Sequence, residues 1–130
     1  MKDKDLQKYL QIMGDSNASP GQRSKAWDAS TVGDAGYVSF TRREAGSYAK
    51  GDWALCEDLV QDAFLKVRES AKSYRPNGSA HQWRKEVTVH AIYDIYRKKK
   101  RRDNIVRTIQ FTPGSGIEKF LGDDPHFPPA

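Results

Sequence analysis

The sequence has one cysteine, three histidines and no long apolar stretch. Cys56 alone cannot form an internal disulfide, and the scattered histidines lack the spacing typical of a zinc site. No apolar run approaches the roughly twenty residues that cross a bilayer, and the charged N-terminal segment 1–15 lacks the apolar core of a secretory signal. We therefore expect no metal, no membrane contact and a cytoplasmic location. Cys56 is predicted to be a small core residue, because it lies on the apolar side of its segment.

Catalytic motifs are also missing. The chain has no glycine-rich phosphate loop, no nucleophile elbow, no HExxH pair and no pair of carboxylates set apart by their surroundings. With 130 residues, of which 37% are hydrophobic, it can form one domain with a modest core. These features predict a small protein that is not an enzyme and needs no cofactor.

Positive charge is concentrated in the second half of the chain. Residues 1–70 hold ten Lys/Arg against eleven Asp/Glu, whereas residues 71–130 hold twelve against six. The segment 84–102 alone contains eight basic and two acidic residues and ends in six consecutive cations. Cations at a helix C-terminus are favoured by the helix dipole, but six adjacent cations repel one another. The run therefore favours contact with a polyanion over simple solvation.

Helical periodicity runs through most of the first hundred residues. Apolar residues three and four apart predict a helix at 4–13, and weaker patterns interrupted by glycines predict helical structure in 22–50. Asp52 is a suitable N-cap for an amphipathic helix of about four to five turns. The Pro-Asn-Gly sequence at 76–78 predicts a turn, and a tryptophan-led helix follows at about 80–101. We expect an all-α fold of three or four helices, with an antiparallel helix pair and an irregular C-terminal tail.

The polar face of the helix after Asp52 is acidic. Glu57, Asp58, Gln61 and Asp62 lie near its N-terminus, where the helix dipole stabilises negative charge. Taken alone, these residues predict only a solvated helix face.

Three segments occur in a characteristic order: EDLVQDAFLKV at 57–67, YRPNGSAHQW at 74–83 and VTVHAIYDIYRKKKRR at 87–102. Together they resemble region 2 of bacterial RNA polymerase sigma factors, most closely the extracytoplasmic-function group. The match covers residues 54–102, and its specificity comes from the ordered set, because DLVQ alone is a weak signal. The resemblance implies a sigma-factor-like transcription initiation module. Such a module binds core RNA polymerase and recognises and melts the minus-ten promoter element.

The resemblance also implies which residues bind. In the family the acidic helix docks on the coiled coil of the polymerase clamp, and the following loop receives a base flipped out of the single-stranded, non-template strand of the minus-ten element. The polymerase-binding set comprises Asp58, Gln61, Asp62 and Arg68. The DNA-binding set comprises the loop residues Asn77, Gly78, Ser79 and Ala80, the helix residues Trp83, Arg84 and His90, and the phosphate-binding cations Arg97, Lys98, Lys99, Lys100, Arg101 and Arg102.

Some of these assignments have alternatives. Trp83 is either a core residue or a stacking platform for a base, and the apolar stripe along its helix favours the core. His90 stands where many family members have an asparagine that touches DNA, and it either hydrogen-bonds DNA or is merely structural. Arg84 and Lys85 stand where many members have apolar residues, which predicts a rotated or thinner helix core.

The chain departs from the family at both ends. Its first fifty residues match poorly, and no second helix-turn-helix domain follows. We predict a region-2-like domain at 1–104 and a linker or docking tail at 105–130. Two other functions stay open: a basic protein that binds nucleic acid without sequence preference, and a regulator that imitates a sigma domain and occupies the polymerase clamp. An anti-sigma factor is a further candidate partner.

Overall fold

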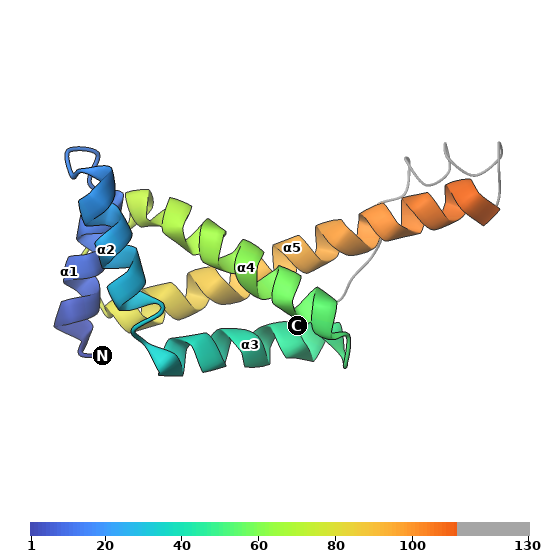
Figure 1. Cartoon of the computed structure of the whole chain (residues 1–130), viewed down its shortest axis with the longest axis horizontal. Helices are drawn as coiled ribbons and strands as arrows, with labels where there is room; N and C mark the ends of the chain where they lie inside the picture. The colour runs from blue at the N-terminus through green and yellow to red at the C-terminus, as the bar shows by residue number, and fades with distance from the viewer. Residues whose placement is uncertain (112–130) are drawn as a thin grey trace. The chain divides into compact units, whose positions relative to one another are not determined.

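The computed structural model describes residues 1–111, with side chains through Ile105, and this part of the chain contains only helices, turns and loops. The all-α prediction is confirmed, with five α-helices and a short 3₁₀ helix where the sequence predicted three or four helices. None of the described helices is long and apolar enough to cross a membrane. In chain order the elements are α1 (Asp3–Gly14), α2 (Pro20–Ser30), α3 (Ala35–Ala49), α4 (Trp53–Ser70), η1 (Ala71–Ser73) and α5 (Ala80–Phe111) (Figure 1).

The chain divides into two units, residues 1–92 and the residues from Tyr93 onward, of which the structure describes 93–111. The first unit contains α1 to α4, η1 and the N-terminal part of α5. The predicted loop residues and the predicted polymerase-binding residues all belong to this unit, whereas the basic run at 97–102 belongs to the second.

The last helix is longer than predicted. It was expected to end near residue 101 but continues to Phe111, so residues 105–111 are helical rather than part of an irregular tail. The physical reason is visible in the sequence: no glycine or proline occurs between Ser79 and Pro113, so the basic run contains no helix breaker. The remainder of the predicted tail, 112–130, lies outside the described residues.

Side-chain caps fix where helices begin in the weakly patterned segment 22–50. Ser19 Oγ accepts a hydrogen bond from Gln22 N at 3.1 Å, and the Gln22 side chain accepts one from Ser19 N at 2.9 Å, which completes a capping box for α2. Asp34 starts α3 by accepting from Tyr37 N at 3.3 Å. The predicted helical content is confirmed, and these caps explain how it persists despite the glycines.

The helix α4 begins at its predicted cap, where Asp52 accepts a hydrogen bond from Leu55 N at 3.0 Å. Its apolar face is buried as the four-residue repeat predicts, through Leu59, Val60, Ala63 and Val67. Cys56 is only half-buried, in contrast to its predicted core position, because it lies in the first turn of α4, directly after an exposed turn.

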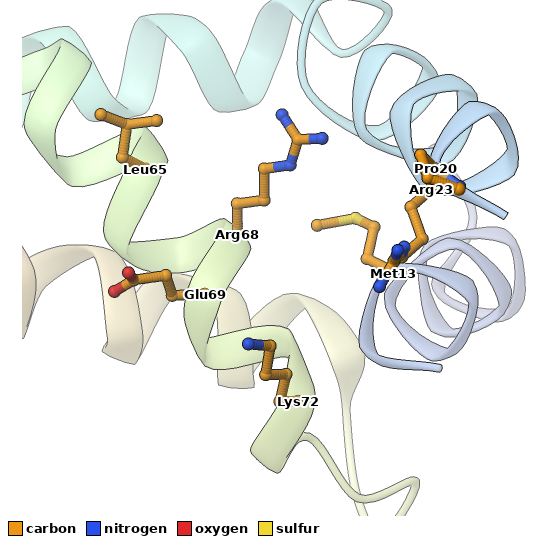
Figure 2. Close-up of a pocket in the computed structure, with 7 residues that line it drawn as sticks. All are labelled: Met13, Pro20, Arg23, Leu65, Arg68, Glu69 and Lys72. Carbon is orange, nitrogen blue, oxygen red and sulfur yellow. The ribbon is translucent and has the colours of Figure 1, made fainter. Parts of the chain in front are cut away.

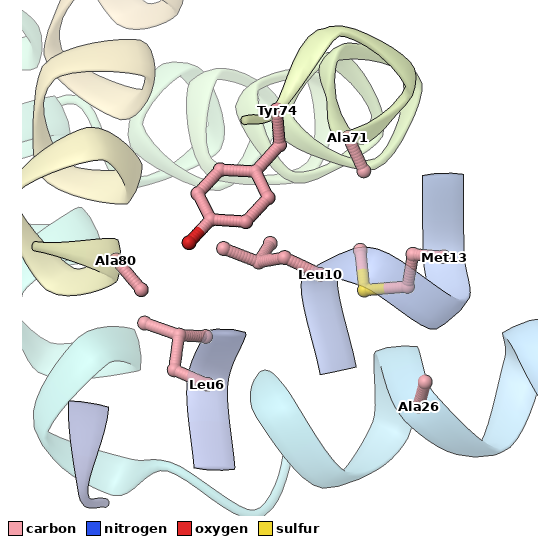
Figure 3. Packing of buried hydrophobic residues seen from close by; sticks show 7 residues of the cluster. All are labelled: Leu6, Leu10, Met13, Ala26, Ala71, Tyr74 and Ala80. Carbon is pink, nitrogen blue, oxygen red and sulfur yellow. The ribbon is translucent and has the colours of Figure 1, made fainter. Parts of the chain in front are cut away.

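A hydrophobic cluster joins α1 to the elements around it (Figure 3). Leu6, Leu10 and Met13 project from one side of α1, at the spacing the sequence predicted. They pack with Ala26 of α2, Ala71 of η1, Tyr74 and Ala80. Because α1 contacts all of these elements, it holds the loop after η1 and the start of α5 in place.

A second buried region lies among α3, α4 and the N-terminal part of α5. Thr41, Ala45 and Ala49 are the buried residues of α3 beyond Tyr37. The Tyr37 hydroxyl lies 2.8 Å from Thr88 Oγ1 of α5, so the two helices are joined by a buried hydrogen bond.

The C-terminus of α1 approaches η1 so closely that only glycine fits. A Cβ atom at Gly14 would collide with the carbonyl oxygen of Ala71. A Cβ atom at Gly46 in α3 would meet no atom within 4 Å. These two glycines therefore provide a matched pair for testing the fold.

Gly14→Ala is expected to lower the free energy of unfolding by about 1–3 kcal/mol, because the backbone of η1 must move to admit the methyl group. Gly46→Ala is expected to raise it by about 0.5–1 kcal/mol, because alanine favours the helix and meets no obstacle. Urea unfolding followed by circular dichroism measures both. A neutral Gly14→Ala would contradict the close approach of α1 and η1.

Candidate functional site

The outer face of α4 carries the predicted polymerase-binding residues. Asp58, Gln61 and Arg68 are exposed and Asp62 is partly exposed. Together with Leu65 they follow a spacing of three and four residues, which places them on one side of a helix. This side lies opposite the buried face of α4, and we call these five residues the α4 outer face. The structure therefore brings the whole predicted set together.

An exposed leucine lies at the centre of the α4 outer face and was not predicted as a site residue. Leu65 is 62% exposed and lines two open pockets. One pocket, of about 430 Å³, includes Gln61 and Val32. The other, of about 470 Å³, includes Arg68 and Met13 (Figure 2). A large apolar side chain surrounded by polar groups is typical of a protein-binding surface.

Some polar and charged side chains on and beside this face are paired within the protein, and others are not. Glu57 pairs with Arg42 of α3 at 2.8 Å, and an exposed pair of this kind contributes about 0–1 kcal/mol. No hydrogen bond or ion pair joins the side chain of Asp58 or Gln61 to another described residue. These two side chains are therefore available to a partner.

The predicted base pocket lies in the loop between η1 and α5. Asn77, Gly78 and Ser79 are all exposed. Gly78 has a φ of 105°, in the left-handed region, and no atom lies within 4 Å of the position that a Cβ atom would take. The loop surface is therefore open at its centre, with Asn77 and Ser79 on either side of the glycine in the chain.

Ala80 was predicted as a member of the DNA-binding set, and the structure places it in the core. It is 0% exposed and belongs to the same hydrophobic cluster as Leu6 and Tyr74 (Figure 3). The physical reason is that Ala80 begins α5 on the side that packs against α1, so its methyl group is covered.

A carboxylate from α1 occupies the start of α5. Asp3 Oδ1 accepts hydrogen bonds from Ser79 Oγ and His81 N at 3.0 Å each, and Oδ2 accepts one from Ala80 N at 3.1 Å. The N–H groups of His81 and Ala80 are the main reason why the pKa of Asp3 lies below its ordinary value. No sequence pattern indicated this contact, because Asp3 lies 76 to 78 residues from its partners.

The contact with Asp3 limits what the loop can offer to a ligand. The N–H groups of Ala80 and His81 already donate to the carboxylate. Ser79 Oγ also donates to Asp3, and it accepts from Gln82 N at 3.2 Å. Among the exposed loop residues of the predicted set, Asn77 is thus the one whose side chain has unengaged donors and acceptors.

Trp83 packs within the protein, which supports its interpretation as a core residue. Its ring centroid lies 5.0 Å from that of Tyr74 in an edge-to-face arrangement. It is partly buried against the cluster around α1. The remaining exposed part of the ring lies in the first turns of α5, close in sequence to the loop.

Arg84, also predicted as a DNA contact, is only 4% exposed and binds groups inside the protein. Its Nη1 donates to the Ser30 carbonyl oxygen and its Nη2 to Asp34 Oδ2, both at 2.7 Å. The guanidinium carbon lies 3.8 Å from the centroid of the Tyr37 ring. Desolvation raises the pKa of Asp34, but hydrogen bonds from Arg84 and Tyr37 outweigh it and keep the pKa below its ordinary value. The Asp34 carboxylate is therefore ionised beside Arg84.

The remaining cationic and histidine positions are accessible. His90 is exposed in the first unit. In the second unit the predicted phosphate-binding residues all lie on α5, and none is fully buried. The exposed ones are Lys98, Lys100 and Arg102, and the partly exposed ones are Arg97, Lys99 and Arg101.

Residues 36–102 match the protein family described as Sigma-70 region 2. The chain belongs to this family. The match confirms the resemblance and extends it from residue 54 back to residue 36, so that α3 is part of the sigma region 2 domain. No curated protein and no solved structure matches the chain.

Membership of the sigma region 2 family gives the chain a sigma-factor-like role in transcription initiation. Proteins of this family are initiation factors rather than enzymes, which confirms the prediction of no enzyme activity. The family also implies interaction with core RNA polymerase and with promoter DNA.

Arg84→Ala is expected to lower the free energy of unfolding by about 3–5 kcal/mol, because it leaves the Asp34 carboxylate charged and largely buried without its partner. Lys72→Ala, at an exposed position of η1, is the control and should change stability by less than about 0.5 kcal/mol. Chemical unfolding of both variants measures the difference. Equal stabilities would contradict the structural role of Arg84.

Asp3→Asn is expected to destabilise the fold at neutral pH, and the difference from the unchanged protein should shrink as the pH falls below about 4. The sign follows from the lowered pKa: the ionised carboxylate stabilises the fold above its unfolded pKa, and this stabilisation is lost as the pH falls through the folded pKa. Thermal unfolding at a series of pH values measures it. Asp5→Asn, on the exposed side of the same helix, should show little of this dependence; a parallel response would show that Asp3 has no special role.

Proposed function

We propose that this chain is an extracytoplasmic-function-type sigma region 2 module that docks on core RNA polymerase and captures the opened minus-ten element, in the cytoplasm. The proposal rests on one observation: side chains at the positions where the family binds its partners are exposed and have no partner within the described protein. Asp58, Gln61 and Asn77 are exposed, and their side chains have no hydrogen bond or ion pair to other described residues. They lie on two separate surfaces of the first unit.

The α4 outer face is the proposed polymerase-docking surface. Asp58 and Gln61 offer polar groups, and Leu65 offers an apolar centre between two open pockets. Arg68 lies over the Trp27 ring, with 5.9 Å from its guanidinium carbon to the ring centroid, which restrains a long side chain before binding. An apolar centre surrounded by polar and charged groups of both signs suits a protein partner that docks by complementary shape and charge.

The loop Asn77–Ser79 is the proposed site for a flipped base of the non-template strand. Flipping costs a few kcal/mol of unstacking, so the loop must offer close approach and hydrogen bonds to the exposed base edge. Gly78 permits close approach because it carries no side chain. Asn77 supplies both a donor and an acceptor, while Ser79 is held by Asp3 and shapes the loop.

The cations of the basic run and His90 are the proposed contacts with the phosphate backbone. Such contacts supply affinity that falls steeply with salt and carry little sequence information. The specificity of the module therefore depends on the loop, and its place on the enzyme depends on the α4 outer face.

Alanine at both Asp58 and Gln61 is expected to weaken binding to bacterial core RNA polymerase by about 5- to 30-fold, the effect of removing one or two useful interface contacts. Asn77→Ala should leave polymerase binding unchanged. The measurement is a pull-down titration with core polymerase. Asp5→Ala, which removes a carboxylate from α1, is the matched control and should bind normally.

The same variants separate docking from base capture in a second assay. The polymerase-bound chain is used to select from single-stranded DNA with a randomised six-nucleotide segment, and the unchanged protein is expected to enrich one motif. Asn77→Ala should bind polymerase normally and lose the enrichment. Binding to DNA without motif and without polymerase would indicate a non-specific nucleic-acid-binding protein. Polymerase binding without any enrichment would indicate a sigma-mimicking regulator.

A further inference from the structure

The first turn of α5, directly after the proposed base-binding loop, begins with three N–H groups that all donate within the protein. Ser79 Oγ accepts from Gln82 N at 3.2 Å, which engages the third of them. The first two, from Ala80 and His81, donate instead to Asp3 Oδ2 and Oδ1, at 3.1 Å and 3.0 Å. We propose that Asp3 determines what the loop selects: its carboxylate fills the anion-binding start of α5, keeps phosphate out of the loop and leaves the edge of a base as the group that the loop binds.

The start of a helix attracts anions. Its first N–H groups have no partner inside the helix, and the helix dipole places partial positive charge at this end. Such a position binds phosphate readily when it is open. The start of α5 would be open without Asp3, because Ser79 is exposed and Asp3 itself is only partly buried. Asp3 therefore occupies a place that would otherwise accept a phosphate group.

The packing of α1 holds the carboxylate in this place. Leu6 follows Asp3 by three residues, so both lie on the same side of α1. Leu6 is 0% exposed and packs in the same hydrophobic cluster as Ala80, the first residue of α5. His81 Nε2 lies 2.8 Å from the backbone oxygen of Met1, which is a second contact between the N-terminal segment and α5. The N–H groups of His81 and Ala80 lower the pKa of Asp3, so the group that meets α5 is the ionised carboxylate.

An ionised carboxylate beside the loop changes which part of a nucleotide the loop can bind. A flipped nucleotide carries an uncharged base and a negatively charged phosphate, and both can accept hydrogen bonds. Asp3 repels the phosphate and already engages the hydroxyl of Ser79 at 3.0 Å. Among the exposed residues of the predicted loop, Asn77 keeps an unengaged side chain, an uncharged amide whose donors and acceptor match a base edge. This step rests on the proposed function, whereas the exclusion of anions from α5 rests only on the contacts of Asp3.

The first test titrates the full chain with inorganic phosphate and needs no DNA. Asp3→Ala removes the carboxylate, and phosphate is then expected to shift the amide NMR signals of Ala80 and His81 in a saturable way. The unchanged protein should show no such shift, because both N–H groups are occupied. No shift in the folded variant, or an equal shift in the unchanged protein, would overturn the proposal.

The matched control is Asp5→Ala, which removes the same charge from an exposed position of the same helix. If it gains the same shift at residues 80 and 81, the effect follows net charge alone and the proposal is wrong. Circular dichroism checks that each variant is folded. Asp3→Asn, which keeps the volume of the side chain, replaces Asp3→Ala if the latter does not fold. Phosphate is expected to displace its uncharged amide, because charge-assisted hydrogen bonds are the stronger ones.

The second test measures binding of a fluorescent single-stranded oligonucleotide of twelve thymidines by anisotropy, over a range of salt concentrations. Asp3→Ala is expected to bind about fivefold more tightly at low salt. Its slope of log affinity against log salt should be steeper by about 0.7, the change expected for one added phosphate contact on a single strand. Asp5→Ala should gain less than about twofold and keep the slope of the unchanged protein. A purely structural role of Asp3 predicts no gain, so unchanged or weaker binding by folded Asp3→Ala contradicts the proposal.

Selection by the polymerase-bound chain separates this inference from the proposed function. With randomised single-stranded DNA, Asp3→Ala should bind polymerase normally and lose motif enrichment, because phosphate then competes for the loop. If the unchanged protein enriches no motif while Asp3→Ala still gains phosphate binding, base capture fails and the exclusion of anions by Asp3 stands. If both proteins enrich the same motif equally, base capture stands and Asp3 does not determine selection.

Discussion

The buried ion pair between Arg84 and Asp34 is the interaction on which the arrangement of the first unit depends. Asp34 accepts a hydrogen bond from Tyr37 N at the start of α3 and also binds the guanidinium of α5, while Arg84 reaches the last carbonyl of α2 through Ser30. One contact thus fixes the ends of three helices. Burying two charges is costly, and here two short hydrogen bonds and an aromatic face offset that cost, although Arg84 Nε has no hydrogen-bond partner.

The start of α5 is consequently held from two sides. Asp34 holds it from α3, and Asp3 holds it from α1 by accepting three hydrogen bonds around the first turn. Both carboxylates have a lowered pKa, because each is stabilised in its charged form. Polar contacts inside the fold therefore orient the residues that face outwards, namely the loop around Gly78 and the cations beside it. The arrangement is fixed before any partner binds, which lowers the entropic cost of binding.

The sequence was most informative where a periodic pattern or an ordered motif was present. The four-residue repeat and the cap at Asp52 were enough to predict α4 and its buried face, and the order of motifs was enough to predict the family. Exposure within α5 could not be predicted, because the partners that bury Arg84 and Ala80 are distant in sequence. The contact of Asp3 with the start of α5 could not be predicted for the same reason. The end of α5 was placed too early, since a run of cations is not a helix breaker.

Leu65 leaves an apolar surface exposed on the free protein. Leu65 is 62% exposed and the nearby Val32 is 75% exposed, so this side of the first unit presents apolar groups to water. Exposed apolar surface promotes self-association, whereas a formal net charge of +5 makes copies of the chain repel one another. Salt screens that repulsion without weakening apolar contacts. Ionic strength therefore sets how strongly copies of the chain repel one another while this apolar surface is exposed.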